Sequence, residues 1–460
     1  MLAFRVVRKP FLNELKSLGL LAFPLVLGQL AHSGVGFTDT LMVGRLGGLE
    51  LAGVALGNAV YFFLFIFCSG VLYSVAPSVS QANGAGEQSQ LLLAARQGVW
   101  LALFMSVPIA VLLNFMEPLL LATGQDGQVA ALAAAYLRTI SWGFGPMILT
   151  VALRGFLEGT GDTRPLMFIL FMGLAVKILL NSVLLTGWGP FPALGLRGAA
   201  LSSAFVYLCE FSAAALYITL RHRGLRVLVE LGRPHRAMLG ELIRVGVPIG
   251  ITLGFESGLF TVAAFLMGIF GSSELAAHQI ALASSSMAFN IPLAVGLATG
   301  VRVGLNGGRQ DRTAAARAAF TGGGVALAAM WLTASAFWLF PERITGLFLD
   351  LGDPANHDVV GFAISFIGFA AMFQLADGVQ VAASGALRGY KDTTVPMYIS
   401  MVSYWLIGLG GGLRRAFPLG LGPAGIWIGL VAGLTAAAVL LSVRLRWRVR
   451  QPISRRLVTE

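Results

Sequence analysis

The sequence predicts an all-α integral membrane protein of twelve transmembrane helices, arranged as two six-helix repeats, or lobes, around a central cavity. Three features predict this fold class: the composition, a succession of long apolar runs, and short motifs that occur twice. Hydrophobic residues make up 57% of the 460 residues and charged residues only 12%, and the mean hydropathy is +0.80. Soluble domains usually carry about 25% charged residues. A membrane protein with little room for a soluble domain is therefore expected.

The apolar runs give the expected spans in order. A run of about 20 apolar residues covers the hydrocarbon core of a bilayer. The first run continues too far to be the core of a signal peptide, so an uncleaved first span is expected. The polar segments 81–90 and 305–313 occupy matching places and predict loops. The twelve expected spans are 18–39, 51–80, 91–115, 130–153, 165–187, 198–220, 241–269, 274–300, 314–340, 359–384, 395–413 and 420–443.

Two pairs of matching motifs divide the chain into two copies. GRLGGLELA at 44–52 returns as GIFGSSELA at 268–276, and GFLEGTGDT at 155–163 returns as GALRGYKDT at 385–393. Internal repeats are common in secondary transporters, whose substrate site lies between the halves. The expected organisation is a cytoplasmic N-terminal segment 1–17, an N-lobe 18–220, a cytoplasmic linker 221–240, a C-lobe 241–443 and a basic cytoplasmic tail 444–460.

Prolines occur inside several of the runs, and each favours a kink because it removes a backbone donor. Pro24 and Pro248 occupy matching places in the two copies. This placement suits helices that bend when a transporter switches. For any single proline, the higher proline content of membrane helices is the preferred explanation.

The basic residues predict the orientation. A net charge of +11 alone would suggest a nucleic-acid partner, but the basic residues gather in short segments beside apolar runs. With twelve spans, one side of the membrane holds only Arg45, Arg138, Arg197, Arg343, Arg414 and Arg415. Cytoplasmic loops carry an excess of Lys and Arg. Both termini are therefore expected in the cytoplasm, with the chain crossing a bacterial inner membrane many times and binding no nucleic acid.

No pattern for catalysis, cofactor or metal binding stands out. The chain has no GxxxxGK[ST] motif, so ATP is not expected as the energy source. Cys68 and Cys209 both lie inside apolar runs, and neither forms metal-ligand spacing with a histidine. Nothing indicates a Ser-His-Asp arrangement. We therefore expect no enzyme activity, no metal site and no cofactor.

Isolated charges inside apolar runs are the candidates for function. Glu256 lies in the middle of the seventh run, and Asp377 lies deep in the tenth. Charged residues in hydrocarbon are costly and usually face a wet cavity or an ion pathway. The alternative for Glu256 is a structural role, with its carboxylate satisfied by the hydroxyl of Ser257 or Thr261.

A second candidate set lies in the first copy. Lys177 and Asn181 are four residues apart, so they share one face of a helix. Asp39 ends the first run, where a charge costs less, so functional and interfacial roles are equally open. The places that match Glu256 and Asp377 in this copy hold no acid. Each half is therefore expected to carry its own polar pocket with its own chemistry.

Four short motifs carry a family resemblance that covers essentially the whole chain. They are DTLMVG at 39–44, EGTGDTRP at 158–165, AHQIAL at 277–282 and LRGYKDTTVP at 387–396. In these motifs the chain resembles the multidrug and toxic compound extrusion family, and within it the NorM-type branch. The resemblance implies a two-lobed antiporter that expels organic cations in exchange for Na⁺ or H⁺.

The resemblance also implies roles for particular residues. Glu256 and Asp377 are similar to the acids of the family's C-lobe cation site, while Asp39 and Asn181 are similar to residues of its N-lobe pocket, which would include Lys177. Gln279 and Phe373 are further candidates for lining the cavity. Where Na⁺-using relatives carry a tyrosine one turn before the aspartate of span 10, this sequence has Phe373.

The leading hypothesis is a monomeric exporter of small cationic, amphipathic compounds. Na⁺ prefers several oxygen ligands, and Phe373 cannot supply a hydroxyl, so H⁺ is expected as the coupling ion, with Na⁺ as the alternative. The rival hypothesis is a lipid-linked oligosaccharide flippase of the same broader superfamily. A pyrophosphate substrate would favour several basic residues in the cavity, but Lys177 stands nearly alone among mostly acidic intramembrane charges.

Overall fold

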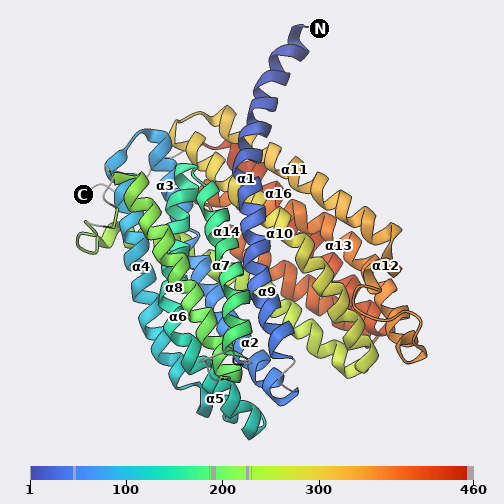
Figure 1. Cartoon of the computed structure of the whole chain (residues 1–460). Coiled ribbons are helices and arrows are strands. Elements are labelled where there is room, and N and C mark those ends of the chain that lie inside the picture. Colours follow the sequence, from blue (N-terminus) through green and yellow to red (C-terminus); the bar gives the residue numbers. More distant parts are fainter. Residues whose placement is uncertain are drawn as a thin grey trace. The chain divides into compact units, whose positions relative to one another are not determined.

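The computed structural model describes residues 2–44, 48–185, 187, 193–223, 227–228 and 230–452, with the backbone alone described at 2–9 and at position 40. These residues form helices and no strand (Figure 1). The first copy holds α1 (Leu2–Val43), α2 (Gly48–Leu72), α3 (Val75–Ala85), α4 (Gln88–Asn114), α5 (Met116–Ala122), α6 (Gly127–Thr160), α7 (Arg164–Leu184) and α8 (Gly195–Arg221). The second holds α9 (Arg236–Phe270), α10 (Ser272–Gly308), α11 (Arg312–Leu339), α12 (Pro341–Thr345), η2 (Pro354–Asn356), α13 (His357–Gly389), α14 (Thr394–Met401), η3 (Val402–Gly410), α15 (Gly411–Ala416) and α16 (Gly422–Arg450).

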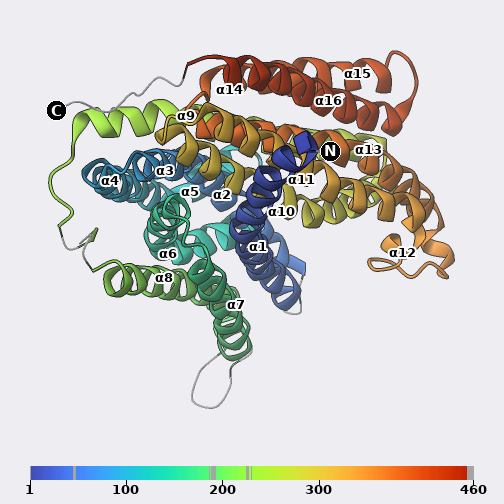
Figure 2. The ribbon, with the colours of Figure 1, turned by 90° about the horizontal axis from the view of Figure 1, so that it is seen from above.

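The all-α membrane fold predicted from the sequence is confirmed. Within the described residues, eleven helices are long and apolar enough to cross a membrane. The remaining expected span, 395–413, is covered by α14, η3 and α15, which follow one another without a gap. Its central part, η3, is a π-helix. In Figure 2 these three segments run beside α16, which η3 and α15 contact.

Two loop predictions were wrong. Segments 81–90 and 305–313 are mostly helical, because α3 and α10 continue to Ala85 and Gly308. Each helix ends at a residue in the left-handed region, Gly86 with φ 73° and Gln310 with φ 60°. The next helix begins within two residues of that turn. A glycine-rich, polar stretch can thus extend a helix when its last carbonyls are satisfied by such a cap. Residues 2–17 of the expected lead-in are likewise continuous with the first span in α1.

The described chain divides into two compact units, which we call unit 1 and unit 2. Unit 1 holds the residues up to Val26 and those from Ile251 onward, whereas unit 2 holds Leu27–Gly250. Both boundaries lie inside a helix, two residues after Pro24 in α1 and two residues after Pro248 in α9. The first helix of each copy therefore starts in one unit and finishes in the other.

The two units repeat the same packing. In unit 2, α6 contacts α2, α4 and α8, and in unit 1, α13 contacts the corresponding helices α10, α11 and α16. The repeated motif at 155–163 and 385–393 ends these two central helices. Gly161 and Lys391 both adopt positive φ there, and the next amide, that of Asp162 or Asp392, donates back to a leucine carbonyl. The motif is therefore a helix C-cap that was duplicated with the fold.

Close backbone approach holds α10 against α13. A Cβ added to Gly385 would lie 2.2 Å from the carbonyl oxygen of Gly296, and one added to Gly389 would lie 2.5 Å from that of Gly300. Small residues let membrane helices pack closely. These two positions require glycine because a side chain would not fit there. Their backbone conformation does not require it, since both lie in regular helix.

The helices α1 and α9, which each run from one unit into the other, are held by side-chain contacts within a single unit. In unit 1, Arg302 of α10 makes a two-point contact with the carboxylate of Glu14 in α1, at 2.8 and 2.6 Å. In unit 2, Gln97 of α4 donates to the carbonyl of Arg233 at 3.2 Å and accepts from the amide of His235 at 2.8 Å, just before α9. In each helix this contact lies before the proline, Pro24 in α1 and Pro248 in α9.

Candidate functional site

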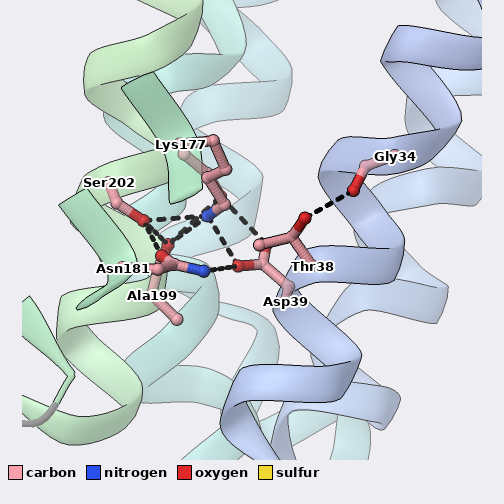
Figure 3. A network of polar contacts seen from close by, with 8 residues as sticks. Gly34, Thr38, Asp39, Lys177, Asn181, Ala199 and Ser202 are labelled. Carbon is pink, nitrogen blue, oxygen red and sulfur yellow. Dashed lines mark hydrogen bonds and ion pairs between the residues drawn. The ribbon is translucent and has the colours of Figure 1, made fainter. Parts of the chain in front are cut away.

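A buried network of polar side chains lies in unit 2 (Figure 3). Lys177 and Asn181 lie four residues apart on one face of α7, Asp39 comes from α1, and Ser202 and Ser203 come from α8. All five side chains are buried, and Lys177 is 0% exposed. We call these five residues the Asp39 network. The structure thus brings together the three residues that the sequence predicted for this pocket.

Both oxygens of the Asp39 carboxylate are contacted by hydrogen-bond donors. Lys177 Nζ lies 2.6 Å from Asp39 Oδ1, and Asn181 Nδ2 donates to the same oxygen at 2.9 Å. The hydroxyl of Ser203 donates to Oδ2 at 3.2 Å. Lys177 also donates to Ser202 Oγ at 2.8 Å and to the carbonyl of Ala199 at 3.0 Å. The amide oxygen of Asn181 accepts from Ser202.

A buried charge is tolerated when it is paired and hydrogen-bonded. The Asp39 network meets both conditions, since one carboxylate faces one ammonium. A substrate cation or a proton that reaches Asp39 must therefore compete with Lys177. The Asp39 network is therefore balanced in charge by its own residues.

The two acids predicted for the second site lie in unit 1, and we call Glu256 and Asp377 the acid pair. Asp377 of α13 is 2% exposed, while Glu256 of α9 is half-buried. The two carboxylates repel each other electrostatically, and Arg388, also on α13, acts on Glu256. The pair therefore places two carboxyl groups, one from α9 and one from α13, inside membrane-spanning helices.

The surroundings of the acid pair leave polar atoms unpaired. Asp377 Oδ1 is buried and accepts no hydrogen bond from any described group. On the same helix, Gln374 Nε2 and Gln380 Oε1 are also buried without a partner. The other amide atom of Gln374, Oε1, accepts from the hydroxyl of Thr333 at 2.6 Å. Unsatisfied buried groups are costly. A mobile cation or proton at Asp377 would relieve that cost.

The remaining two predicted residues occupy different surroundings. Phe373 is 5% exposed, and its ring meets that of Phe260 edge-on with 5.7 Å between centroids. It lies in the apolar core of unit 1, one turn before Asp377. Gln279 is exposed on α10, next to the buried His278.

The sequence analysis missed a second buried charge cluster in unit 2. Arg154 of α6 donates to Glu158 Oε1 at 2.6 Å and to Gln29 Oε1 at 2.8 Å. Glu210 of α8 is 5% exposed and interacts electrostatically with Arg154. The signal for Glu210 was available, because it is an isolated acid inside an apolar run, as Glu256 is.

The polar clusters do not resemble a metal centre. Among the residues that the structure describes, no three His, Cys, Asp or Glu side chains are grouped so that they could hold a metal ion. The acid pair offers two carboxylates, and the amides of Gln374 and Gln380 lie on the same helix as Asp377.

Sequence comparison identifies relatives over nearly the whole chain. The MatE family model matches twice, over residues 24–183 and 248–412, which confirms the two copies. A probable multidrug resistance protein NorM of Rhizobium meliloti (strain 1021) is 41% identical over 429 residues, covering 92% of this chain and 91% of that protein. A probable multidrug resistance protein NorM of Deinococcus radiodurans is 41% identical over 440 residues, covering 95% of this chain and 96% of that protein.

Solved structures with the same fold are membrane transporters. The eukaryotic MATE transporter AtDTX14 superposes with a TM-score of 0.85 at 22% identity, covering 97% of this chain and 100% of that chain. A MATE protein in complex with MaD3S superposes with a TM-score of 0.87 at 20% identity, covering 95% and 96%. The members of the MatE family are transporters, so the prediction that the chain is not an enzyme is confirmed. The chain belongs to the MatE family of multidrug and toxic compound extrusion transporters and is of the NorM type.

Proposed function

We propose that this chain is a secondary antiporter that exports small cationic, amphipathic compounds in exchange for H⁺. The observation that supports this most directly is the acid pair. Asp377 carries a buried oxygen that has no donor among the described residues, and it interacts electrostatically with Glu256. The relatives named as multidrug resistance proteins support the substrate class. The proposed location is the inner membrane of a bacterium, with both termini in the cytoplasm.

The exchange follows from the charge of the site. Two carboxylates in a low-dielectric region favour binding one positive charge, since like charges close together disfavour full ionisation. A proton and an organic cation can each supply that charge. If they bind in turn from opposite sides of the membrane, the entry of one drives the release of the other. Coupled carboxylates of this kind titrate as a pair.

The absence of a hydroxyl at Phe373 supports H⁺ over Na⁺. A hard cation prefers several oxygen ligands, whereas a proton needs one carboxylate oxygen. The side chain one turn before Asp377 is an aromatic ring packed on Phe260. Na⁺ would lack a ligand from this position.

Flippase activity toward an anionic lipid-linked pyrophosphate is less well supported. Such a substrate needs basic side chains that are available to it. Lys177 is engaged with Asp39 at 2.6 Å. Arg154 is engaged with Glu158 and Gln29. Each of these two basic side chains is therefore already bound to an acid or an amide, so neither is available to an anionic substrate.

The test is transport in proteoliposomes loaded with the purified full chain. Radiolabelled tetraphenylphosphonium serves as the cation, and either a pH gradient or a Na⁺ gradient is imposed alone. The pH gradient is expected to drive counter-transport, and Glu256→Gln and Asp377→Asn should each abolish the response. Asp358→Asn, an exposed acid at the start of the same helix α13, is the matched control and should respond normally.

Transport driven by Na⁺ and indifferent to the pH gradient would overturn H⁺ coupling. A normal response by both acid-pair variants would overturn the assignment of the site. Flux of a lipid-linked pyrophosphate without flux of tetraphenylphosphonium would favour the flippase.

A further inference from the structure

The ammonium nitrogen of Lys177 lies among four oxygen atoms, which we call the oxygen cage (Figure 3). Asp39 Oδ1 lies 2.6 Å from Nζ, and the carbonyl oxygen of Ala199 lies 3.0 Å from it. The hydroxyl oxygens of Ser202 and Ser203 lie at 2.8 and 2.6 Å. A lysine ammonium group has three N–H donors. The oxygen cage therefore offers one acceptor more than the ammonium group has hydrogens.

The two serine hydroxyls of the oxygen cage have acceptors of their own. Ser202 donates to the amide oxygen of Asn181, and Ser203 donates to Asp39 Oδ2 at 3.2 Å. Both hydroxyls also lie within donating distance of the carbonyl oxygen of Ala199. Their hydrogens can thus point away from Lys177 Nζ while their lone pairs face it. The oxygen cage therefore suits a buried positive charge, which is tolerated when it is paired and hydrogen-bonded.

The positive charge in the oxygen cage is tethered to α7. The side chain of Lys177 is 0% exposed, whereas that of Asp39 is 11% exposed. A mobile cation that approaches the site meets the Asp39 carboxylate first and finds its Oδ1 already 2.6 Å from Nζ. Stability alone does not explain this lysine, because replacing a buried ion pair by apolar residues of similar volume is often neutral or stabilising.

We propose that the oxygen cage is a binding site for a primary ammonium group and that Lys177 is its built-in ligand. Lys177 is then a residue that determines specificity, because it keeps mobile cations out of the Asp39 network. The consequence for transport rests on the proposed function: the charge of an exported cation is balanced at the acid pair, and the oxygen cage holds no second mobile charge. When the Lys177 side chain is shortened, the site should accept a free alkylammonium ion.

The first test replaces the tethered group with a free ion. Lys177→Ala removes the methylenes beyond Cβ together with the ammonium group, and propylammonium carries the same atoms. A ligand that binds the folded state stabilises it. Propylammonium should therefore raise the Tm of purified Lys177→Ala further than that of the wild-type chain, and the difference should saturate with concentration.

The controls separate binding in the oxygen cage from other effects of a cation. Tetramethylammonium has the same charge but no N–H donor, so it should give both chains the same shift. Binding of either ion at the acid pair is common to both chains and cancels in the comparison. Lys16→Ala, which removes an exposed lysine of α1, is the matched control and should behave as the wild type.

Two further variants keep the test decisive. Asp39→Asn in the Lys177→Ala background removes the carboxylate of the oxygen cage and should abolish the extra shift. Lys177→Met keeps the length of the side chain and vacates the nitrogen position, so the ammonium ion is its matched probe if Lys177→Ala does not fold. No extra shift in either Lys177 variant would overturn the assignment, and so would an extra shift that persists without the Asp39 carboxylate.

Counting bound ions tests the effect on specificity. Equilibrium dialysis of the purified full chain with radiolabelled propylammonium should show one more ion bound per chain in Lys177→Ala than in the wild type. Asp39→Asn in the same background should remove that additional ion. Equal numbers in Lys177→Ala and the wild type would overturn the role of Lys177 in specificity.

Neither measurement involves transport. If a pH gradient fails to drive the wild-type chain but the additional ion is found, the proposed coupling fails and the oxygen cage stands. If the wild-type chain is proton-driven and the additional ion is not found, the oxygen cage alone fails.

Discussion

Lys177 makes the two polar sites differ in charge. In unit 2 it lies 2.6 Å from Asp39 and brings the Asp39 network close to neutrality. In unit 1, two acids lie together, and Asp377 Oδ1 has no donor among the described residues. One site thus carries its own counter-charge, whereas we propose that the other binds a mobile one. A duplicated frame has in this way acquired two different chemistries.

Removing Lys177 should destabilise the fold, because Lys177 balances the buried charge of Asp39. Lys177→Met leaves Asp39 buried beside amide and hydroxyl groups only, so we expect a loss of about 3 kcal/mol of stability. Adding Asp39→Asn should restore most of it, because the buried charge is then gone. Thermal unfolding of the purified variants measures both effects, and Lys16→Met, an exposed lysine of α1, is the control. Purely additive losses in the double variant would show that the two side chains are not coupled.

The sequence predicted the charged members of both sites and Asn181, but not the serines that complete the Asp39 network. Asp39, Lys177, Glu256 and Asp377 stood out because a charge inside an apolar run is costly. Serines are ordinary on membrane helices, so nothing distinguished Ser202 and Ser203 before α7 and α8 were seen together.

The helix ends show where reasoning from local sequence fails. Segments 81–90 and 305–313 are rich in glycine and polar residues, as loops are, yet they are mostly helix. The deciding factor is a single residue with positive φ in each, Gly86 or Gln310. It ends one helix so sharply that the next begins almost at once. The duplication of this turn was visible in the sequence, but its length was not.

The contact between α10 and α13 depends on the absence of side chains at its centre. Gly385→Ala places a methyl group 2.2 Å from the carbonyl oxygen of Gly296, so the helices must separate. We expect a loss of about 1–3 kcal/mol, the usual cost of overpacking, measured by thermal unfolding in detergent. Gly361→Ala, an exposed glycine of α13 with no atom within 4 Å of the added methyl, should be neutral. Equal stability of the two variants would show that α10 moves away at no cost.

Across the whole molecule, the number and order of spans followed from apolar runs and charge asymmetry. The family model that matches at 24–183 and again at 248–412 confirms the duplication. The division into units was not predicted, because the sequence repeat suggests a boundary in the linker. The units instead divide α1 and α9 near Pro24 and Pro248. Hydropathy identifies α1 and α9 as spans, but it does not indicate which part of each helix packs into which unit.

The orientation in the membrane remains a prediction from the distribution of arginines, and labelling tests it. Cys68 and Cys209 are first replaced by alanine, and single cysteines are introduced at the exposed positions Glu230 and Ala355. A membrane-impermeant maleimide added to intact cells should reach position 355 and miss position 230. Position 455 should also be missed, although it lies outside the residues that the structure describes. Labelling at 230 in intact cells would reverse the topology.

The division of α1 and α9 between the two units has a consequence for biosynthesis. The ribosome makes residues up to Val26 first, but their unit is continued only from Ile251. The contact between Glu14 and Arg302 joins residues 288 positions apart. Unit 2 can be complete once Gly250 has been translated, whereas the opening segment must wait for more than half the chain. During that interval the partly buried carboxylate of Glu14 has no arginine to receive it. We therefore expect unit 1, to which the first residues belong, to be completed after unit 2.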